Sequence, residues 1–155
     1  MPVQWLSKEA AQAYLAENNT GRLATCDADG QPYVVPLNYV YFKGHIFFHC
    51  ALKGKKLNHI MQNPKVCFEV SETDELDLAD QPCGCATRFT SVLVIGTAEV
   101  IKDTDEKLSV LDAFIRHLAP LKNYPALRSE MADACVVVKI RIMEISGKKN
   151  VRSLK

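Results

Sequence analysis

Short apolar runs bounded by turn residues recur along the chain, and they predict more strands than helices. Turn signals lie between them, such as residues 27–30, which end in glycine, and the pair Lys43 and Gly44. The segment 33–42 is apolar on both faces, so we expect little water on either face. Pro36 cannot donate a ladder hydrogen bond, which favours an edge strand or a bulge there. The predicted strands are 22–26, 33–42, 45–50, 65–70, 88–101 and 134–145.

Three segments carry apolar residues at helical spacing. Ser7 is a suitable N-cap for the first. Asn63 with Pro64 ends the second, because a residue before proline disfavours helical geometry. The predicted helices are 7–17, 54–62 and one from 103 or 104 to 118.

Local irregularities predict where regular structure stops. Gly96 lies inside a strand pattern and predicts a bulge or a close backbone approach. The alternation slips at 143–145, which predicts a second bulge or the end of a strand. The acidic segment 71–82 predicts a mobile loop, and 146–155 predicts a basic tail.

The order of these elements predicts a mainly β protein. Hairpin-like links favour antiparallel pairing, and antiparallel sheets remove their edges by closing into barrels. We therefore expect a six-stranded antiparallel β-barrel with peripheral helices. A length of 155 residues suits one domain over 1–155.

Composition excludes several classes of protein. The net charge of +1 gives no general basic field for nucleic acid. No apolar run approaches the roughly 20 residues of a membrane helix, and the first twelve residues lack a secretory pattern. The six cysteines are irregularly spaced, so reduced thiols and a cytoplasmic location are expected.

Common metal and hydrolase sites are also not predicted. Cys83 and Cys85 lack the spacing of a zinc half-site. His45 and His49 lie about 13 Å apart on an extended strand, too far to share one ion. Cys50 and His49 are neighbours on a strand, so their side chains point to opposite faces and form no dyad.

A cluster of lysines lies where the strand 45–50 runs into the helix 54–62. No acidic residue occurs between Asp29 and Glu69, whereas this interval holds five lysines and three histidines. A helix start with added lysines is a natural anion site. Arg88 and Ser91 would complete a phosphate cradle if their strand lies alongside, and an ordinary solvated lysine cluster is the alternative. The cradle residues of this turn, called the lysine turn below, are Lys53, Gly54, Lys55 and Lys56.

An ordered series of motifs spans roughly residues 20–148. It resembles the pyridoxamine 5′-phosphate oxidase-like, FMN-binding split-barrel family, and within it the nitroimidazole-resistance (Nim-type) branch. The motifs are GRLAT (21–25), PLNY (36–39), IFFHCA (46–51), GKKL (54–57), NPKVCFEV (63–70), FTSV (89–92, after Cys83), GTA (96–98) and ISGK (145–148).

The resemblance implies a flavin-dependent oxidoreductase that reduces a small molecule. It implies a homodimer of split β-barrels with FMN, or FAD, at the subunit interface. It places the flavin ring against the strand 36–39 and the phosphate at the lysine turn, and it makes His49 the catalytic or substrate-positioning group. The implied cofactor-binding residues are Pro36, Leu37, Asn38, Tyr39, Lys53, Gly54, Lys55, Lys56, Arg88, Ser91 and Val92.

Two alternatives stay open from the sequence. One is a protein that binds flavin for storage or sensing without turnover. The other is a haem-binding split barrel with His49 as axial ligand. The chain departs from the family at 71–82, and it lacks the C-terminal Trp and Arg substrate region of true pyridoxamine phosphate oxidases. Pyridoxamine phosphate is therefore not the expected substrate.

Overall fold

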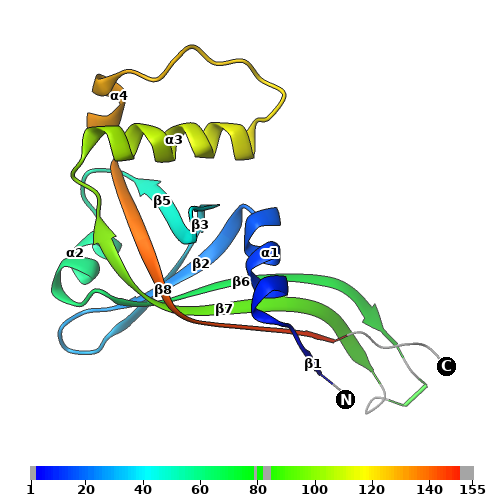
Figure 1. Ribbon diagram of the computed structural model, residues 1–155. Coiled ribbons are helices and arrows are strands. Elements are labelled where there is room, and N and C mark those ends of the chain that lie inside the picture. The colour runs from blue at the N-terminus through cyan, green and yellow to red at the C-terminus, as the bar shows by residue number, and fades with distance from the viewer. Residues whose placement is uncertain (1–2, 79, 82–84, 151–155) are drawn as a thin grey trace.

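The computed structural model describes residues 3–78, 80–81 and 85–150, which fold around one curled antiparallel sheet (Figure 1). The strand order is β3-β2-β6-β7-β8-β5-β4, and β1 pairs with β8. The predicted class, a mainly β antiparallel split barrel with peripheral helices, is confirmed, with eight strands in place of six. The strands are β1 Gln4–Trp5, β2 Thr20–Cys26, β3 Pro32–Asn38, β4 Val40–Phe42, β5 His45–Cys50, β6 Lys65–Asp77, β7 Ala86–Val100 and β8 Val136–Asn150.

The three predicted helices are confirmed, and a short fourth helix was not predicted. Ser7 caps α1, because its Oγ accepts a hydrogen bond from the Ala10 N–H at 3.1 Å. Asp103 caps α3 in the same way through the Glu106 N–H at 2.7 Å. A five-residue helix is too short for apolar periodicity to reveal. The helices are α1 Lys8–Glu17, α2 Lys55–Gln62, α3 Thr104–Leu118 and α4 Ser129–Asp133.

The core lies on one face of the sheet. Alternate residues of five neighbouring strands point to this face, and α1 and α3 add Leu15 and Phe114. These side chains are almost completely buried, so their removal from water drives the packing of the helices onto the sheet. The fully buried strand residues include Leu23, Phe48, Phe68, Val94 and Ile140.

The predicted strand 33–42 is two strands, and Tyr39 lies between them. β3 and β4 stand at opposite edges of the sheet order, so the chain crosses from one edge to the other at this residue. The Tyr39 N–H donates to the Asn19 carbonyl at 2.9 Å, and its hydroxyl donates to the Leu15 carbonyl at 2.8 Å. Its ring packs edge-on against Phe68. The edge position predicted for Pro36 is confirmed.

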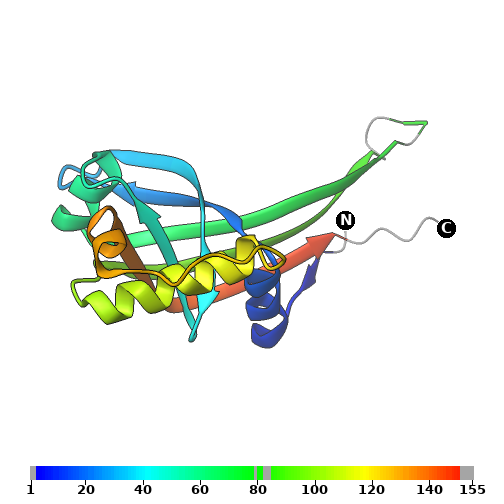
Figure 2. The ribbon, with the colours of Figure 1, turned by 90° about the horizontal axis from the view of Figure 1, so that it is seen from above.

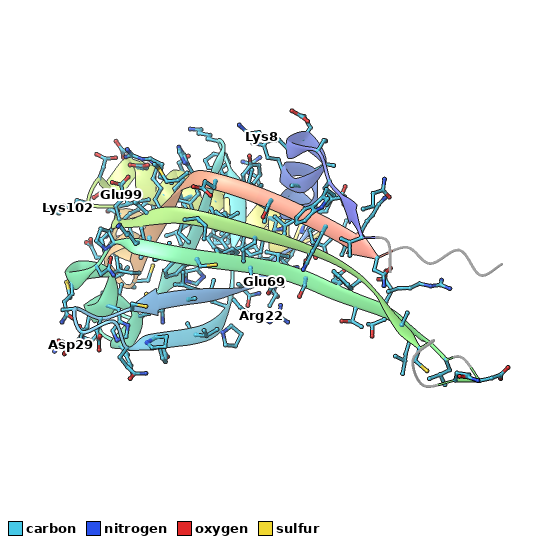
Figure 3. All side chains as sticks on the ribbon, turned by 90° about the horizontal axis from the view of Figure 1, so that it is seen from below. Lys8, Arg22, Asp29, Glu69, Glu99 and Lys102 are labelled. Carbon is cyan, nitrogen blue, oxygen red and sulfur yellow. The ribbon has the colours of Figure 1, made fainter. Side chains whose placement is uncertain are left out.

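The opposite face of the sheet, called the outer face here, is open to solvent. It carries Arg22, Val34, Glu69, Leu93 and Ile95, and Figure 3 looks onto it where Arg22 and Glu69 lie together. Their ion pair is 3.0 Å long. Val34 is 60% exposed, so the expectation that water reaches neither face of 33–42 is wrong for the single chain.

The predicted loop 71–82 is largely a strand. β6 continues to Asp77 alongside β7, and β8 pairs with β7 as far as Phe89. This end of the sheet is an arm, two-stranded beyond Phe89, that projects from the body in Figures 1 and 2. A register shift between Thr73 and Leu76 interrupts the pairing. Residues 79 and 82–84, with Cys83 and Gly84 of the excluded zinc pattern, lie outside the described residues.

The predicted tail 146–155 is a strand as far as it is described. β8 runs to Asn150, whose side-chain amide donates to the Thr87 carbonyl at 2.8 Å. Asn150 is 6% exposed, so this contact anchors the end of β8 on the arm. Residues 151–155 lie outside the described part of the chain.

The two predicted bulges are one. Ile95 pairs with Glu144 and Gly96 with Ile142, so Met143 is the extra residue on β8. A Cβ on Gly96 would collide with the Arg141 carbonyl oxygen. The glycine is therefore needed because the bulge brings the two backbones close together.

We expect Gly96→Ala to lower the free energy of unfolding by about 1–3 kcal/mol, because backbone must shift to admit the methyl group. Gly147→Ala is the matched control. Its Cβ would meet the Leu6 side chain at 2.8 Å, and a side chain moves more easily than backbone. Urea unfolding of both variants checks this, and an equal loss in both would contradict the backbone explanation.

Candidate functional site

The lysine turn lies directly before α2. β5 ends at Cys50, and α2 begins at Lys55 with Gly54 as its N-cap. No side chain caps this helix start. The first N–H groups of α2 are therefore available to an external acceptor, as an anion site requires.

A polar cavity of about 480 Å³ opens beside this helix start. Lys55 and Gly54 line it from the turn, and Asp27 and Asp29 line it from the turn between β2 and β3. Asp27 Oδ1 accepts hydrogen bonds from the N–H groups of Asp29 and Gln31 at 3.0 and 2.8 Å, so this carboxylate already holds its own turn. Asn58, His59 and Gln62 complete the lining.

His59 is the buried member of this lining. It is 4% exposed, and its Nδ1 lies 3.1 Å from the Thr25 hydroxyl. Tyr33 packs edge-on against its ring at 5.8 Å. This group has no signal in the sequence, because His59, Thr25 and Asp27 come from separate segments that only the fold brings together.

The lysines of the turn have different surroundings. Lys55 Nζ lies 5.0 Å from the centre of the Tyr33 ring, in a cation–π contact. Burial raises the pKa of the Cys50 thiol, and the positive charge of Lys56 opposes that rise. Lys53 is exposed. The turn therefore offers three cations around one helix start.

The His49 side chain points to the opposite face of β5 from Cys50 and packs against α3. Its ring meets Phe114 edge-on at 5.0 Å, with an interplanar angle of 89°. His49 also borders a second cavity of about 460 Å³, between α3, α4 and the segment that joins them. The residues lining this apolar cavity are His49, Leu111, Phe114, Ile115, Leu118, Ala119, Tyr124, Leu127, Met131 and Cys135.

The predicted ring-binding strand is an edge strand. Pro36 and Asn38 are exposed on the outer face, and Leu37 is half-buried on the core face. β3 has no partner on its far side in the sheet order, so part of its backbone is available for bonding. The Tyr39 side chain lies in the core and its N–H is already bonded, so of these four side chains only those of Pro36 and Asn38 face outward.

Arg88 and Ser91 lie on the arm, and Val92 lies where the arm joins the core, all away from the lysine turn. Cys50 pairs with Val136, whereas Ser91 pairs with Lys148, twelve residues further along β8 (148 − 136). That separation is on the order of 40 Å along the strand, and Figure 1 shows α2 and the arm at opposite ends. Val92 is fully buried in the core. One chain therefore does not bring these two groups together.

Neither a metal centre nor a membrane-spanning helix is found among the described residues. Among the described residues, no three His, Cys, Asp or Glu side chains are grouped to hold a metal ion. Within the same part of the chain, no helix is long and apolar enough to cross a membrane.

A model of the family described as "Pyridoxamine 5′-phosphate oxidase" matches residues 7–149. An uncharacterized protein of Rhizobium meliloti (strain 1021) is 35% identical over 72 residues. That alignment covers 46% of this chain and 46% of the relative, so this chain spans about half the length of the curated relative it matches.

Solved structures share the fold over nearly the whole chain. A FAD-binding protein from Mesorhizobium loti is 28% identical, with a TM-score of 0.73 and coverage of 97% of this chain and 100% of that chain. A putative 5-nitroimidazole antibiotic resistance protein from Bacteroides thetaiotaomicron is 24% identical, with a TM-score of 0.78 and coverage of 96% and 89%. The FAD and Heme binding protein from Mycobacterium smegmatis is 20% identical, with a TM-score of 0.87 and coverage of 97% and 75%. The last two show the shared fold alone.

Tyr39→Phe should lower the free energy of unfolding by about 1–3 kcal/mol, because it leaves the Leu15 carbonyl without its buried donor. Tyr33→Phe is the control, since the Tyr33 hydroxyl has no hydrogen-bond partner among the described residues. Chemical denaturation measures both. A Tyr39→Phe protein as stable as the control would mean that the crossing does not depend on this bond.

Proposed function

Because the chain belongs to the pyridoxamine 5′-phosphate oxidase family, we propose that it binds a flavin and acts as a flavin-dependent oxidoreductase. The observation that carries this proposal is the uncapped start of α2, surrounded by Lys53, Lys55 and Lys56. The cofactor is FMN, or FAD as in the Mesorhizobium loti relative. The acceptor is a small molecule, as in the Nim-type proteins that the motifs resemble.

The lysine turn fits the phosphate group that both flavins carry. Free N–H groups at the helix start can donate hydrogen bonds to an anion, and lysine side chains add charge-assisted hydrogen bonds. The carboxylates of Asp27 and Asp29 face the adjacent cavity and would repel an anion placed among them. The phosphate is therefore expected on the Lys53 and Lys56 side of the helix start, away from these carboxylates.

We further propose that the site is completed by a second copy of the chain. Arg88 and Ser91 lie too far from the lysine turn to act on the same phosphate from within one chain. The outer face supports pairing, because Val34, Ala24, Cys67 and Ile95 are successive register partners that form an apolar row across it. In a homodimer the arm of one copy would supply Arg88 and Ser91 to the other.

The chain's own residues would bind the flavin, orient it and shield it from water. The flavin, when bound, supplies the electron chemistry. The exposed edge of β3 would hold the polar edge of its ring through backbone groups. The His49 ring is held edge-on against Phe114, so its imidazole is placed to position a substrate or transfer a proton.

The two alternatives have separate signatures. A storage or sensing protein would hold reduced flavin without passing electrons to an added nitroimidazole under anaerobic conditions. A haem protein with His49 as its axial ligand would show a Soret band. The observation that favours this alternative is the apolar cavity beside His49.

The first test is the absorption spectrum of the purified protein and its titration with FMN and FAD. We expect flavin bands and binding of at least one flavin. Lys56→Ala should weaken binding by about 1.5–3 kcal/mol, the scale of a bond to a charged group. Lys8→Ala is the control, because Figure 3 places Lys8 on α1, away from Asp29 and the polar cavity. A protein that takes up neither flavin is not a flavoprotein.

The shared site is tested by complementation. Lys56→Ala and Arg88→Ala homodimers should each bind flavin weakly. A heterodimer of the two, purified through separate affinity tags, should contain one intact site and one doubly impaired site. It should therefore bind one flavin per dimer with wild-type affinity. If both residues serve one site from the same chain, the heterodimer will regain nothing.

A further inference from the structure

The apolar cavity is built from three parts of the fold. Leu111, Phe114, Ile115 and Leu118 line it from α3, and the segment after α3 together with α4 closes over it. Figure 1 shows this segment arching above α3 before α4 begins. The cavity has a volume of about 460 Å³, which falls in the range of small-molecule sites, about 300–1,000 Å³.

The lining determines the charge of the occupant. None of the ten lining residues is Lys, Arg, Asp or Glu. An ionised ligand would lose hydration there and would meet no lysine, arginine or carboxylate in the lining, which is unfavourable. A dianionic phosphate ester such as pyridoxamine phosphate is therefore disfavoured in this cavity, whereas a neutral molecule enters without that cost.

The shape of the lining favours a flat apolar molecule. Phe114 and Tyr124 offer aromatic surfaces, and Met131 adapts its shape readily. Tyr124, Leu118 and Met131 are 48%, 40% and 36% exposed. A ligand seated among them would remove this apolar surface from water and so gain binding free energy.

One end of the cavity is polar. The His49 imidazole borders the cavity and has no hydrogen-bond partner within the described part of the chain. Burial raises the pKa of the Cys135 thiol, so this second polar group stays neutral. His49 is therefore the group able to donate a hydrogen bond to a ligand that carries an acceptor.

We propose that this cavity binds a neutral aromatic molecule that carries a hydrogen-bond acceptor, with the ring between α3 and α4 and the acceptor at His49. The binding class stands on the cavity alone. The role of this molecule as electron acceptor of the enzyme rests on the proposed function.

The test is ¹⁹F NMR titration of the oxidised protein, without reductant, using three probes. These are 4-fluoronitrobenzene, fluorobenzene and 4-fluorobenzoate. We expect 4-fluoronitrobenzene to bind at least ten-fold more tightly than 4-fluorobenzoate. His49→Leu should weaken 4-fluoronitrobenzene binding roughly five-fold, the scale of one hydrogen bond, and leave fluorobenzene unchanged. Equal binding of the neutral and anionic probes would overturn the proposal.

Matched variants locate the binding site. Leu118→Trp fills the cavity and should abolish probe binding, whereas Leu121→Trp, at a residue 99% exposed and outside the lining, should not. Met131→Lys introduces a cation and should reverse the binding preference, so that 4-fluorobenzoate binds more tightly than 4-fluoronitrobenzene. This variant keeps the test valid if the Leu118→Trp protein fails to fold. Equal effects of the two tryptophan variants, or no reversal in Met131→Lys, would refute the assignment.

Flavin content, read from the absorbance of the same samples, separates this inference from the proposed function. A protein that holds flavin but binds no probe would overturn the inference alone. A protein that binds the probe in this cavity but takes up no flavin would overturn the proposed function alone.

Discussion

The arrangement of the candidate sites depends on the buried crossing at Tyr39. This residue joins the two edges of the sheet, and its hydroxyl and N–H are both bonded to the end of α1 and the residues after it. A buried hydroxyl without its acceptor is costly, so the crossing is fixed in one geometry. The bonds of Tyr39 therefore set the position of the edge strand β3 relative to β4 and β5, and β5 carries His49.

Local sequence signals predicted the elements whose geometry is locally determined. Ser7 and Asp103 cap their helices through contacts three residues away, so the capping pattern is visible in the sequence. The bulge was visible from both strands, since Gly96 and the slipped alternation after Ile142 mark the same irregularity. Short-range geometry constrains such positions whatever the rest of the chain does.

Long-range pairing accounts for the main errors. Glu72 and Asp74 give 71–82 the composition of a loop, yet they extend β6 because β7 supplies a partner of matching length. Backbone pairing outweighs the weak preference of acidic residues for loops. The break at Tyr39 was hidden for the opposite reason. The run 33–42 is uniformly apolar, and only the contact with α1 shows where it divides.

The same distinction explains the site. The lysine turn is contiguous in the sequence, so its cluster of lysines could be predicted. The carboxylates of Asp27 and Asp29, which line the adjacent cavity, belong to a segment for which the sequence predicted only a hairpin turn. The apolar cavity requires α4 and the segment before it, which carry no periodic signal.

The two proposed sites therefore lie in environments of opposite character. The proposed phosphate site is surrounded by lysines, and the cavity beside His49 has no lysine, arginine or carboxylate in its lining. His49 borders the apolar cavity, whereas its neighbour Cys50 ends β5 shortly before the lysine turn, so one strand end adjoins both environments. An anionic cofactor and a neutral substrate would then be sorted by charge alone, without a basic substrate site of the kind that a phosphorylated substrate needs.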